Sequence, residues 1–241
     1  MKTLSFEMNM DSPLIAAEEP TQRVMEIAIT APEDATNIQR PALNIALVID
    51  RSGSMGGEKL EYVKKAAEHV LDLLQDQDRV SLVAYDSEVR LLSPSVAVTR
   101  EARNELKTIL RRLTAGSMTF LSGGWLQGCK EVAEAAQVGM LNRVLLLTDG
   151  LANQGITDLE ELGLHASQLA SLGVPTSTFG VGVDYDEHLL EHIANQGGGQ
   201  YYYIDHPHKI PHIFEQELKE IAAITASNVE VVIDLPQKTA A

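Results

Sequence analysis

Carboxyl and hydroxyl side chains follow directly on an apolar run near residue 50. Residues 45–54 read IALVIDRSGS, so that Asp50 ends the run and Ser52 and Ser54 come next. Carboxylate and hydroxyl oxygens are the hard ligands that Mg²⁺ and Ca²⁺ prefer. A buried strand that leads into a polar turn and a helix places the turn at the carboxyl end of a sheet, where open α/β folds bind ligands. The sequence therefore predicts a divalent-cation site at this turn.

Two further loops can supply the remaining ligands. AGSMTFLSGG contains Thr119, and LLLTDG contains Asp149. Mg²⁺ takes near-octahedral oxygen coordination and keeps several waters, so hydroxyls and water-linked carboxylates suffice, with Mn²⁺ and Ca²⁺ as alternatives. A site built mainly of neutral hydroxyls leaves the cation short of negative charge. We therefore expect a partner to supply a carboxylate.

Each of these residues also has a plainer role. Ser52 and Ser54 could form the turn and cap the following helix, and Asp50 could be a charge favoured at a helix N-terminus. Thr119 could cap a turn, and Asp149 stands before a glycine, which is a common turn signal. The presence of all five residues together favours the metal site.

The elements that must position these residues follow an alternating pattern. Apolar runs of strand length alternate with stretches of helical periodicity, which is typical of βαβ units and a largely parallel sheet. We expect strands at 43–49, 79–85, 88–92, 143–148, 174–181 and 199–204. We expect helices from about 58 to 74, 100 to 112, 123 to 136 with Ser122 as its cap, 158 to 172, 186 to 195 and 207 to 225. The strand at 88–92 forms an antiparallel hairpin with its predecessor, and the fold class is α/β.

The two ends of the chain differ from this pattern. RVMEIAIT (23–30) and NVEVVIDL (228–235) have strand character outside the repeat. Either both belong to a flanking β structure into which the α/β domain is inserted, or the first extends the main sheet and the second is a frayed end. The expected boundaries are an N-terminal segment 1–40, a central domain 41–226 and a C-terminal segment 227–241 that begins a further region.

Composition limits the partners and the compartment. The net charge of -15 disfavours nucleic acid and anionic membranes, because both are bound through Lys and Arg. The first 20 residues have no continuous apolar core of a secretory signal, and no segment approaches the length of a membrane span. The single cysteine, Cys129, fits a reducing compartment. We therefore expect a soluble, cytoplasmic protein.

Three motifs together resemble a known family. DRSGSM, AGSMTFLSGG and LLLTDG resemble the von Willebrand factor type A (VWA) domain with its metal-ion-dependent adhesion site. The family pattern is Asp-x-Ser-x-Ser, a later Thr and a later Asp, filled here by Asp50, Ser52, Ser54, Thr119 and Asp149. The resemblance covers about residues 43–225. It implies a Rossmann-like, doubly wound, mostly parallel sheet with one antiparallel edge, metal bound directly by the serines and sometimes the threonine, and carboxylates that often act through water.

The resemblance also implies a function. VWA domains of this kind are non-enzymatic protein-interaction modules that bind an Asp or Glu of a partner through the metal. The phrase DYDEHLLEHIANQGGGQYYYI resembles the intracellular bacterial branch, whose members often work beside an ATPase or another assembly partner. A shift of the last helix that rearranges the metal ligands is implied only for some members.

Residues near the motifs could form the rim that contacts the partner. We assign Met55, Gly56, Met118 and Trp125 to this rim, because they lie beside the predicted ligands. Tryptophan is enriched in the energetically important parts of interfaces. The alternative for Trp125 is burial against the sheet.

The strongest competing chemistry is the HLLEH motif, which contains His188, Glu191 and His192. It matches HxxEH, in which two histidines hold zinc and the glutamate activates water. A match of five residues is common by chance, and a third ligand from Glu215 or Glu217 has no geometric support. A zinc hydrolase is thus one alternative, and a structural assembly subunit with a closed metal site is another. Dinucleotide, P-loop and nucleophile-elbow motifs are absent.

Overall fold

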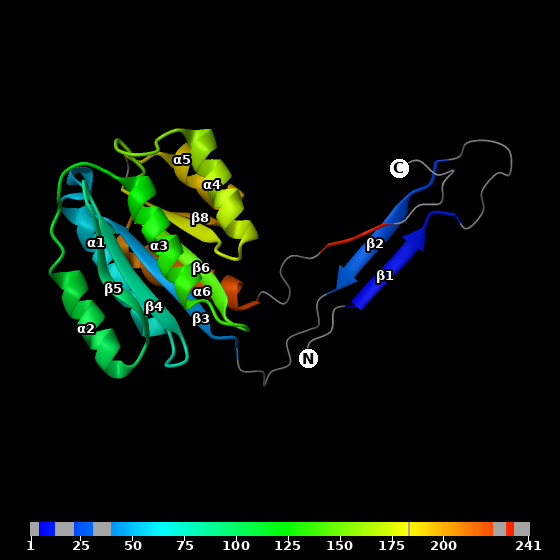
Figure 1. Ribbon diagram of the computed structural model, residues 1–241, viewed down its shortest axis with the longest axis horizontal. Helices are drawn as coiled ribbons and strands as arrows, with labels where there is room; N and C mark the ends of the chain where they lie inside the picture. Colours follow the sequence, from blue (N-terminus) through cyan, green and yellow to red (C-terminus); the bar gives the residue numbers. More distant parts are fainter. Residues whose placement is uncertain (1–4, 13–21, 31–39, 183, 224–229, 234–241) are drawn as a thin grey trace. The chain divides into compact units, whose positions relative to one another are not determined.

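The computed structural model describes residues 5–12, 22–30, 40–182, 184–223 and 230–233 (Figure 1). The chain divides into two units. Pro41–Ala223 contains a six-stranded sheet, and the described residues before it contain a two-stranded sheet. None of the helices among these described residues is long and apolar enough to cross a membrane.

The six-stranded sheet has the order β5-β4-β3-β6-β7-β8. Its strands are β3 (Leu43–Asp50), β4 (Arg79–Tyr85), β5 (Val89–Ala97), β6 (Leu141–Thr148), β7 (Thr176–Val181) and β8 (Gly198–Ile204). All neighbouring pairs are parallel except β4 and β5, which form the antiparallel edge. Every residue of β3 is buried, as expected for a central strand covered on both faces. The predicted α/β fold class is confirmed.

Helices cover both faces of this sheet (Figure 1). One face packs on α1 (Glu58–Leu73), α2 (Arg100–Arg111) and α6 (Ile210–Ala223). The other face packs on α3 (Leu121–Ala135), α4 (Leu159–Ser171) and α5 (Glu187–Gln196). Short 3-10 turns, η1 (Gly53–Met55) and η2 (Pro207–Lys209), precede α1 and α6. Two apolar cores result, one on each side of the sheet.

The start of α3 differs from the prediction. The helix begins at Leu121, so Ser122 lies inside its first turn and does not cap it. Phe120 N donates to Asp86 O at 2.8 Å, and Phe120 O accepts from Gly124 N at 3.1 Å. The second of these hydrogen bonds forms the first turn of the helix, so the helix starts before the predicted residue 123. Ser122 Oγ instead accepts a hydrogen bond from Ile156 N at 3.0 Å. Its hydroxyl thereby fixes the loop that follows β6.

The smaller sheet pairs β1 (Ser5–Met10) antiparallel with β2 (Met25–Thr30). The strand predicted at 23–30 is therefore present, and it pairs with β1 rather than with the edge of the main sheet. β1 was not predicted, although its apolar residues Phe6, Met8 and Met10 alternate with polar ones; all six of its residues are exposed. Of the strand predicted at 228–235, residues 230–233 are neither helix nor strand, and the rest lies outside the described residues.

The register of the sheet brings the predicted ligands together. β3 lies between β4 and β6, with Asp50 opposite Tyr85 on one side and Ile49 opposite Leu147 on the other. The carboxyl ends of these parallel strands therefore meet at one edge. Asp50 and Asp149 emerge from neighbouring strands at that edge.

Candidate metal centre

Three loops meet at the carboxyl ends of β3 and β6. Gly53 N in the first loop donates to Ser117 O in the second at 2.6 Å. Thr119 N in the second loop donates to Asn153 Oδ1 in the third at 2.9 Å. The sequence predicted that these three loops converge, and the hydrogen bonds show that they do.

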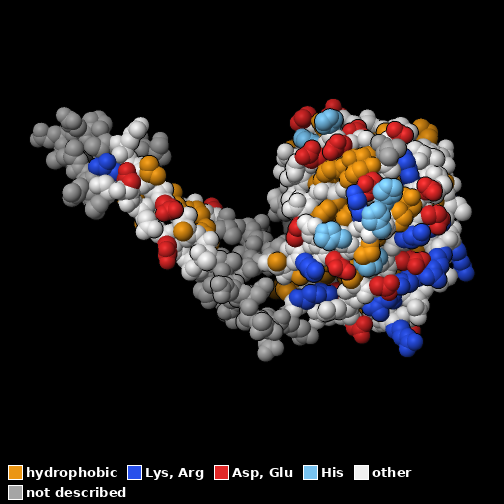
Figure 2. All heavy atoms as spheres, turned by 180° about the vertical axis from the view of Figure 1, so that it is seen from behind, with side chains coloured by type: hydrophobic (Ala, Val, Ile, Leu, Met, Phe, Trp, Pro, Cys, Tyr) orange, Lys and Arg blue, Asp and Glu red, His pale blue; other side chains and the backbone are white. Residues whose placement is uncertain are grey.

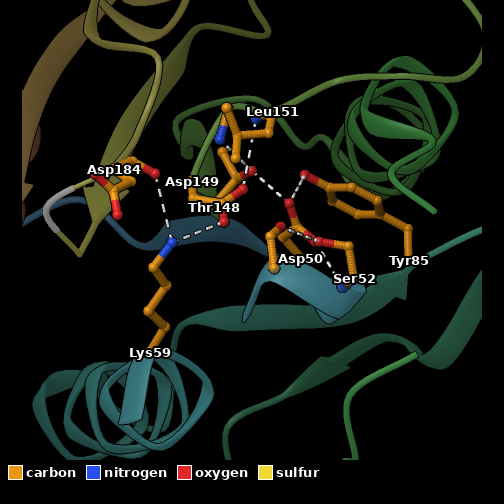
Figure 3. A network of polar contacts seen from close by, with 10 residues as sticks. Asp50, Ser52, Lys59, Tyr85, Thr148, Asp149, Leu151 and Asp184 are labelled. Carbon is orange, nitrogen blue, oxygen red and sulfur yellow. Dashed lines mark hydrogen bonds and ion pairs between the residues drawn. The ribbon is translucent and has the colours of Figure 1, made fainter. Parts of the chain in front are cut away.

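Asp50 is held on both of its carboxylate oxygens (Figure 3). Its side chain is fully buried. Ser52 N donates to Oδ1 at 2.8 Å, while Thr148 Oγ1 at 2.5 Å and Tyr85 OH at 3.3 Å donate to Oδ2. The carboxylate is thus fixed in orientation before any cation arrives.

Burial raises the pKa of Asp50 from its ordinary 3.8 to about 6. The hydrogen bonds from Thr148 and Ser52 lower this pKa, but they do not offset the loss of solvent. The nearby charge of Asp149 raises it further. A buried carboxylate whose charge is disfavoured by a second carboxylate, as for Asp50 beside Asp149, is a suitable environment for a cation.

The metal-free protein should gain stability as pH falls through the pKa of Asp50. In the folded state this pKa is about 6 and in the unfolded chain about 3.8, so the folded state binds the proton more tightly between these values. Above about pH 6 the ionised, buried Asp50 lowers the free energy of unfolding by about 3 kcal/mol. This loss of stability vanishes below about pH 4, where Asp50 is protonated in both states. Asp50→Asn cannot titrate. In urea unfolding with chelator, wild type should therefore gain about 3 kcal/mol relative to Asp50→Asn between about pH 7 and about pH 4. A difference that does not change with pH would contradict this.

Asp149 lies deep in the site, and its side chain has no exposed surface. Its Oδ2 is 3.0 Å from Nζ of Lys59, and its Oδ1 accepts from Leu151 N at 3.4 Å. The backbone of Asp149 also accepts from Asp186 N at 3.0 Å, which ties this loop to the start of α5. The position of this carboxylate is therefore set by the end of β6 and the starts of α1 and α5.

The three hydroxyl residues predicted as ligands differ in exposure. The Oγ atoms of Ser52 and Ser54 are 3.1 Å apart, and Ser54 is exposed whereas Ser52 is buried. Thr119 is 2% exposed, and its hydroxyl has no hydrogen-bond partner within the described residues. A nearly buried hydroxyl without a partner is available to a ligand.

This donor set fits a hard divalent cation. It consists of two buried carboxylates, a close pair of serine hydroxyls and one threonine hydroxyl, all oxygen donors of the kind Mg²⁺ accepts. No group of three or more His, Cys, Asp and Glu side chains in the described part of the chain is placed to hold a metal. The site therefore depends on hydroxyls, as the sequence suggested.

Sequence reasoning missed three residues of the site, Thr148, Tyr85 and Lys59. Thr148 and Tyr85 end buried strands and look like core positions in the sequence. Strand pairing was the available signal, because the residue before Asp149 and the last residue of β4 must both flank Asp50. Lys59 gave no signal, since a lysine in the first turn of a helix is usually solvated.

The predicted rim is wrong for two residues. Met55 and Trp125 are both 0% exposed. Trp125 packs in the core between α3 and the sheet, and its Nε1 donates to Thr176 Oγ1 at 3.0 Å. Met55 joins the core under α1 because η1 turns its side chain inward. Met118 is 47% exposed and Gly56 is also exposed, so these two residues remain candidates for the rim.

Within the part of the chain that the structure describes, no third metal-ligating side chain joins the HLLEH motif of α5. His188 is exposed, whereas the ring of His192 packs against Gly163 of α4, where a Cβ would lie 2.2 Å from Nε2. Glu217 lies in α6 on the opposite face of the sheet and accepts from Ser177 Oγ at 2.6 Å. The arrangement does not support a zinc hydrolase.

Residues 44–216 match the family described as the von Willebrand factor type A domain. The chain is 31% identical over 226 residues to the uncharacterized protein sll0103 of Synechocystis sp., covering 93% of this chain and 52% of that protein. It is 28% identical to the uncharacterized protein YfbK of Escherichia coli, covering 97% of this chain and 40% of that protein. The chain thus spans about half the length of these curated relatives or less.

Solved structures share the fold. The von Willebrand factor type A protein from Catenulispora acidiphila superposes with a TM-score of 0.69 at 23% identity, covering 91% of this chain and 50% of that one. Proximal thread matrix protein 1 from the mussel byssus, described with a zinc-occupied MIDAS motif, superposes with a TM-score of 0.60 at 20% identity, covering 76% and 46%. With its family match and its six-stranded sheet, the chain belongs to the von Willebrand factor type A family.

Proposed function

We propose that this VWA domain is a non-enzymatic interaction module that binds a partner's Asp or Glu through Mg²⁺. The observation that carries the proposal is the pair of buried carboxylates, Asp50 and Asp149, on loops that also carry the paired hydroxyls of Ser52 and Ser54. Asp149 pairs with Lys59, whereas Asp50 has only neutral donors among the described residues, and a buried carboxylate without a cation is costly. The exposed Ser54 leaves one side of a bound cation open to a ligand. The proposal includes that all five predicted ligands form a working adhesion site.

The five predicted ligands would have two different roles. Ser52, Ser54 and Thr119 would hold the cation directly, and Asp50 and Asp149 would act through water. When bound, Mg²⁺ supplies a position that a carboxylate of the partner can occupy. Thr148 donates to Asp50 and accepts from Gly150 N at 2.9 Å, so that one hydroxyl fixes both the first carboxylate and the loop behind it.

The charges of the site favour an acidic ligand. Two carboxylates, one lysine ammonium and a divalent cation leave a net charge of about +1 in the occupied site. The carboxylate of a partner would neutralise it. The resemblance to the bacterial branch points to an ATPase or another assembly protein as the partner that carries this carboxylate.

Basic residues are concentrated in one part of the sequence. Residues 51–112 carry 11 of the 19 basic residues and 10 of the 34 acidic ones. Figure 2 shows basic side chains gathered on the lower right of the larger unit. An open hollow of about 620 Å³ adjoins the loop before α1, and its lining includes both Lys64 and Lys65 and the acidic Glu58 and Glu61. The hollow therefore has no excess of either charge.

Partner binding should depend on the metal. Proteins retained by the immobilised domain in Mg²⁺ should be released by a chelator, because the partner's carboxylate loses the cation it binds. Changing the contacting Asp or Glu of the partner to Asn or Gln should abolish retention in Mg²⁺. Retention of the same proteins with chelator, and by an Asp50→Asn domain, would contradict the proposed function.

A further inference from the structure

Lys59 reaches from the first turn of α1 into the metal centre. Its Nζ lies 3.0 Å from Oδ2 of Asp149 and 3.4 Å from the carbonyl oxygen of Asp184 (Figure 3). The side chain of Lys59 is 21% exposed, whereas that of Asp149 is 0% exposed. This contact is an ion pair at the buried end of the site rather than a surface salt bridge.

The fold provides a path for the stem of this lysine. Gly182, which follows β7, has a φ of +88°, and a Cβ there would lie 2.4 Å from Cε of Lys59 and 3.1 Å from Cδ. The lysine chain therefore passes directly over the glycine backbone. Asp184, whose carbonyl accepts from Nζ, belongs to the same loop. The position of Lys59 is thus built by α1 and the loop after β7 together.

Lys59 balances the charge of one of the two buried carboxylates, Asp149. Asp50 receives hydrogen bonds only from neutral groups, and Asp149 pairs with Lys59, as far as the described residues show. Removing one partner of a buried pair leaves an uncompensated charge and is strongly destabilising. A divalent cation that binds beside Asp149 must in turn approach the ammonium, which repels it.

We propose that Lys59 is an internal counter-ion that competes electrostatically with the divalent cation. It holds Asp149 in place while the metal is absent, and it keeps the affinity for metal alone low. The carboxylate of a partner then offsets the added positive charge, so that metal and partner bind cooperatively. This inference rests on the proposed function and adds a residue that sets the coupling between its two ligands.

Metal affinity of Lys59 variants tests this directly. Calorimetric titration of chelator-treated protein with Mg²⁺ and Mn²⁺ should show that Lys59→Met binds about tenfold more tightly than wild type, because a repelling charge has been removed. Lys59→Gln keeps a hydrogen-bond donor for Asp149 and should also bind more tightly. Lys219→Met, which changes a lysine of α6 whose side chain is 80% exposed, is the matched control and should stay within about twofold of wild type.

Stability provides a second readout of the same competition. Without metal, Lys59→Met should unfold at lower urea than wild type, because Asp149 is left buried and unpaired. Saturating Mg²⁺ should remove this difference.

Equal or weaker metal binding by both Lys59 variants, with wild type binding normally, would overturn the inference and leave the proposed function intact. Absence of binding by wild type and variants alike would overturn the proposed function and the inference with it.

Discussion

Replacing Asp50 with Asn should weaken Mg²⁺ binding by about 100-fold, the upper range for removal of a carboxylate that supports a metal through its outer shell. Asparagine has nearly the same size and keeps one acceptor oxygen for Ser52 N. The hydroxyls of Thr148 and Tyr85 can rotate to accept from its amide, so the local hydrogen bonds survive. What is lost is the negative charge beside the cation. Calorimetric titration of chelator-treated protein measures the effect.

Asp158→Asn is the matched control for this variant. Asp158 caps α4, where its side chain accepts from Glu161 N at 2.9 Å, and asparagine caps equally well. This control makes the same chemical change outside the metal centre and should bind Mg²⁺ as wild type does. Equal binding by wild type, Asp50→Asn and Asp158→Asn would show that Asp50 does not serve the metal.

Replacing Arg143 with Met should lower the free energy of unfolding by about 3 kcal/mol, as expected when one partner of a buried ion pair is removed. Arg143 in β6 and Glu217 in α6 are both buried, with Nε and Oε1 3.6 Å apart. Glu217 also accepts from Ser177 Oγ at 2.6 Å and from Tyr202 OH at 3.0 Å. This network fixes α6 to β7 and β8. Urea unfolding at neutral pH measures the loss.

A double-mutant cycle separates the ion pair from the packing of the arginine stem. Glu217→Met alone should also destabilise, since it leaves Arg143 buried without its carboxylate. The double variant, with both charges removed, should lose clearly less stability than the two single changes added together. Additive losses would mean that the two side chains contribute independently and that the ion pair does not hold α6.

The fold was largely predictable because its central strands are nearly continuous apolar runs. β4 was predicted with its observed bounds at 79–85, and the helix positions followed from periodicity. The terminal sheet was predicted only in part. β2 contains the β-branched residues Ile27, Ile29 and Thr30, whereas β1 has none. The alternation of Phe6, Met8 and Met10 with polar residues was the signal available for β1, and it extends over only six residues.

The meeting of the three loops was predictable from the sequence, whereas the residues that support the five predicted ligands were not. The five predicted ligands lie on the three loops that hydrogen bonds join. Thr148 and Lys59 could not be assigned from sequence, because their roles depend on which strand ends are neighbours and on the path that Gly182 leaves open. Met55 and Trp125 failed as rim residues for a related reason. Nearness in sequence to a ligand does not decide which way a side chain points.

Anomalous diffraction from crystals soaked in Mn²⁺ at neutral pH would show whether a metal binds where the three loops meet. We expect a single strong peak about 2.1 Å from the Oγ atoms of Ser52 and Ser54. The peak should be absent in Asp50→Asn crystals soaked under the same conditions. A wild-type crystal with no peak at these hydroxyls, or with its strongest peak at the histidines of α5, would contradict a metal-dependent adhesion site in this protein.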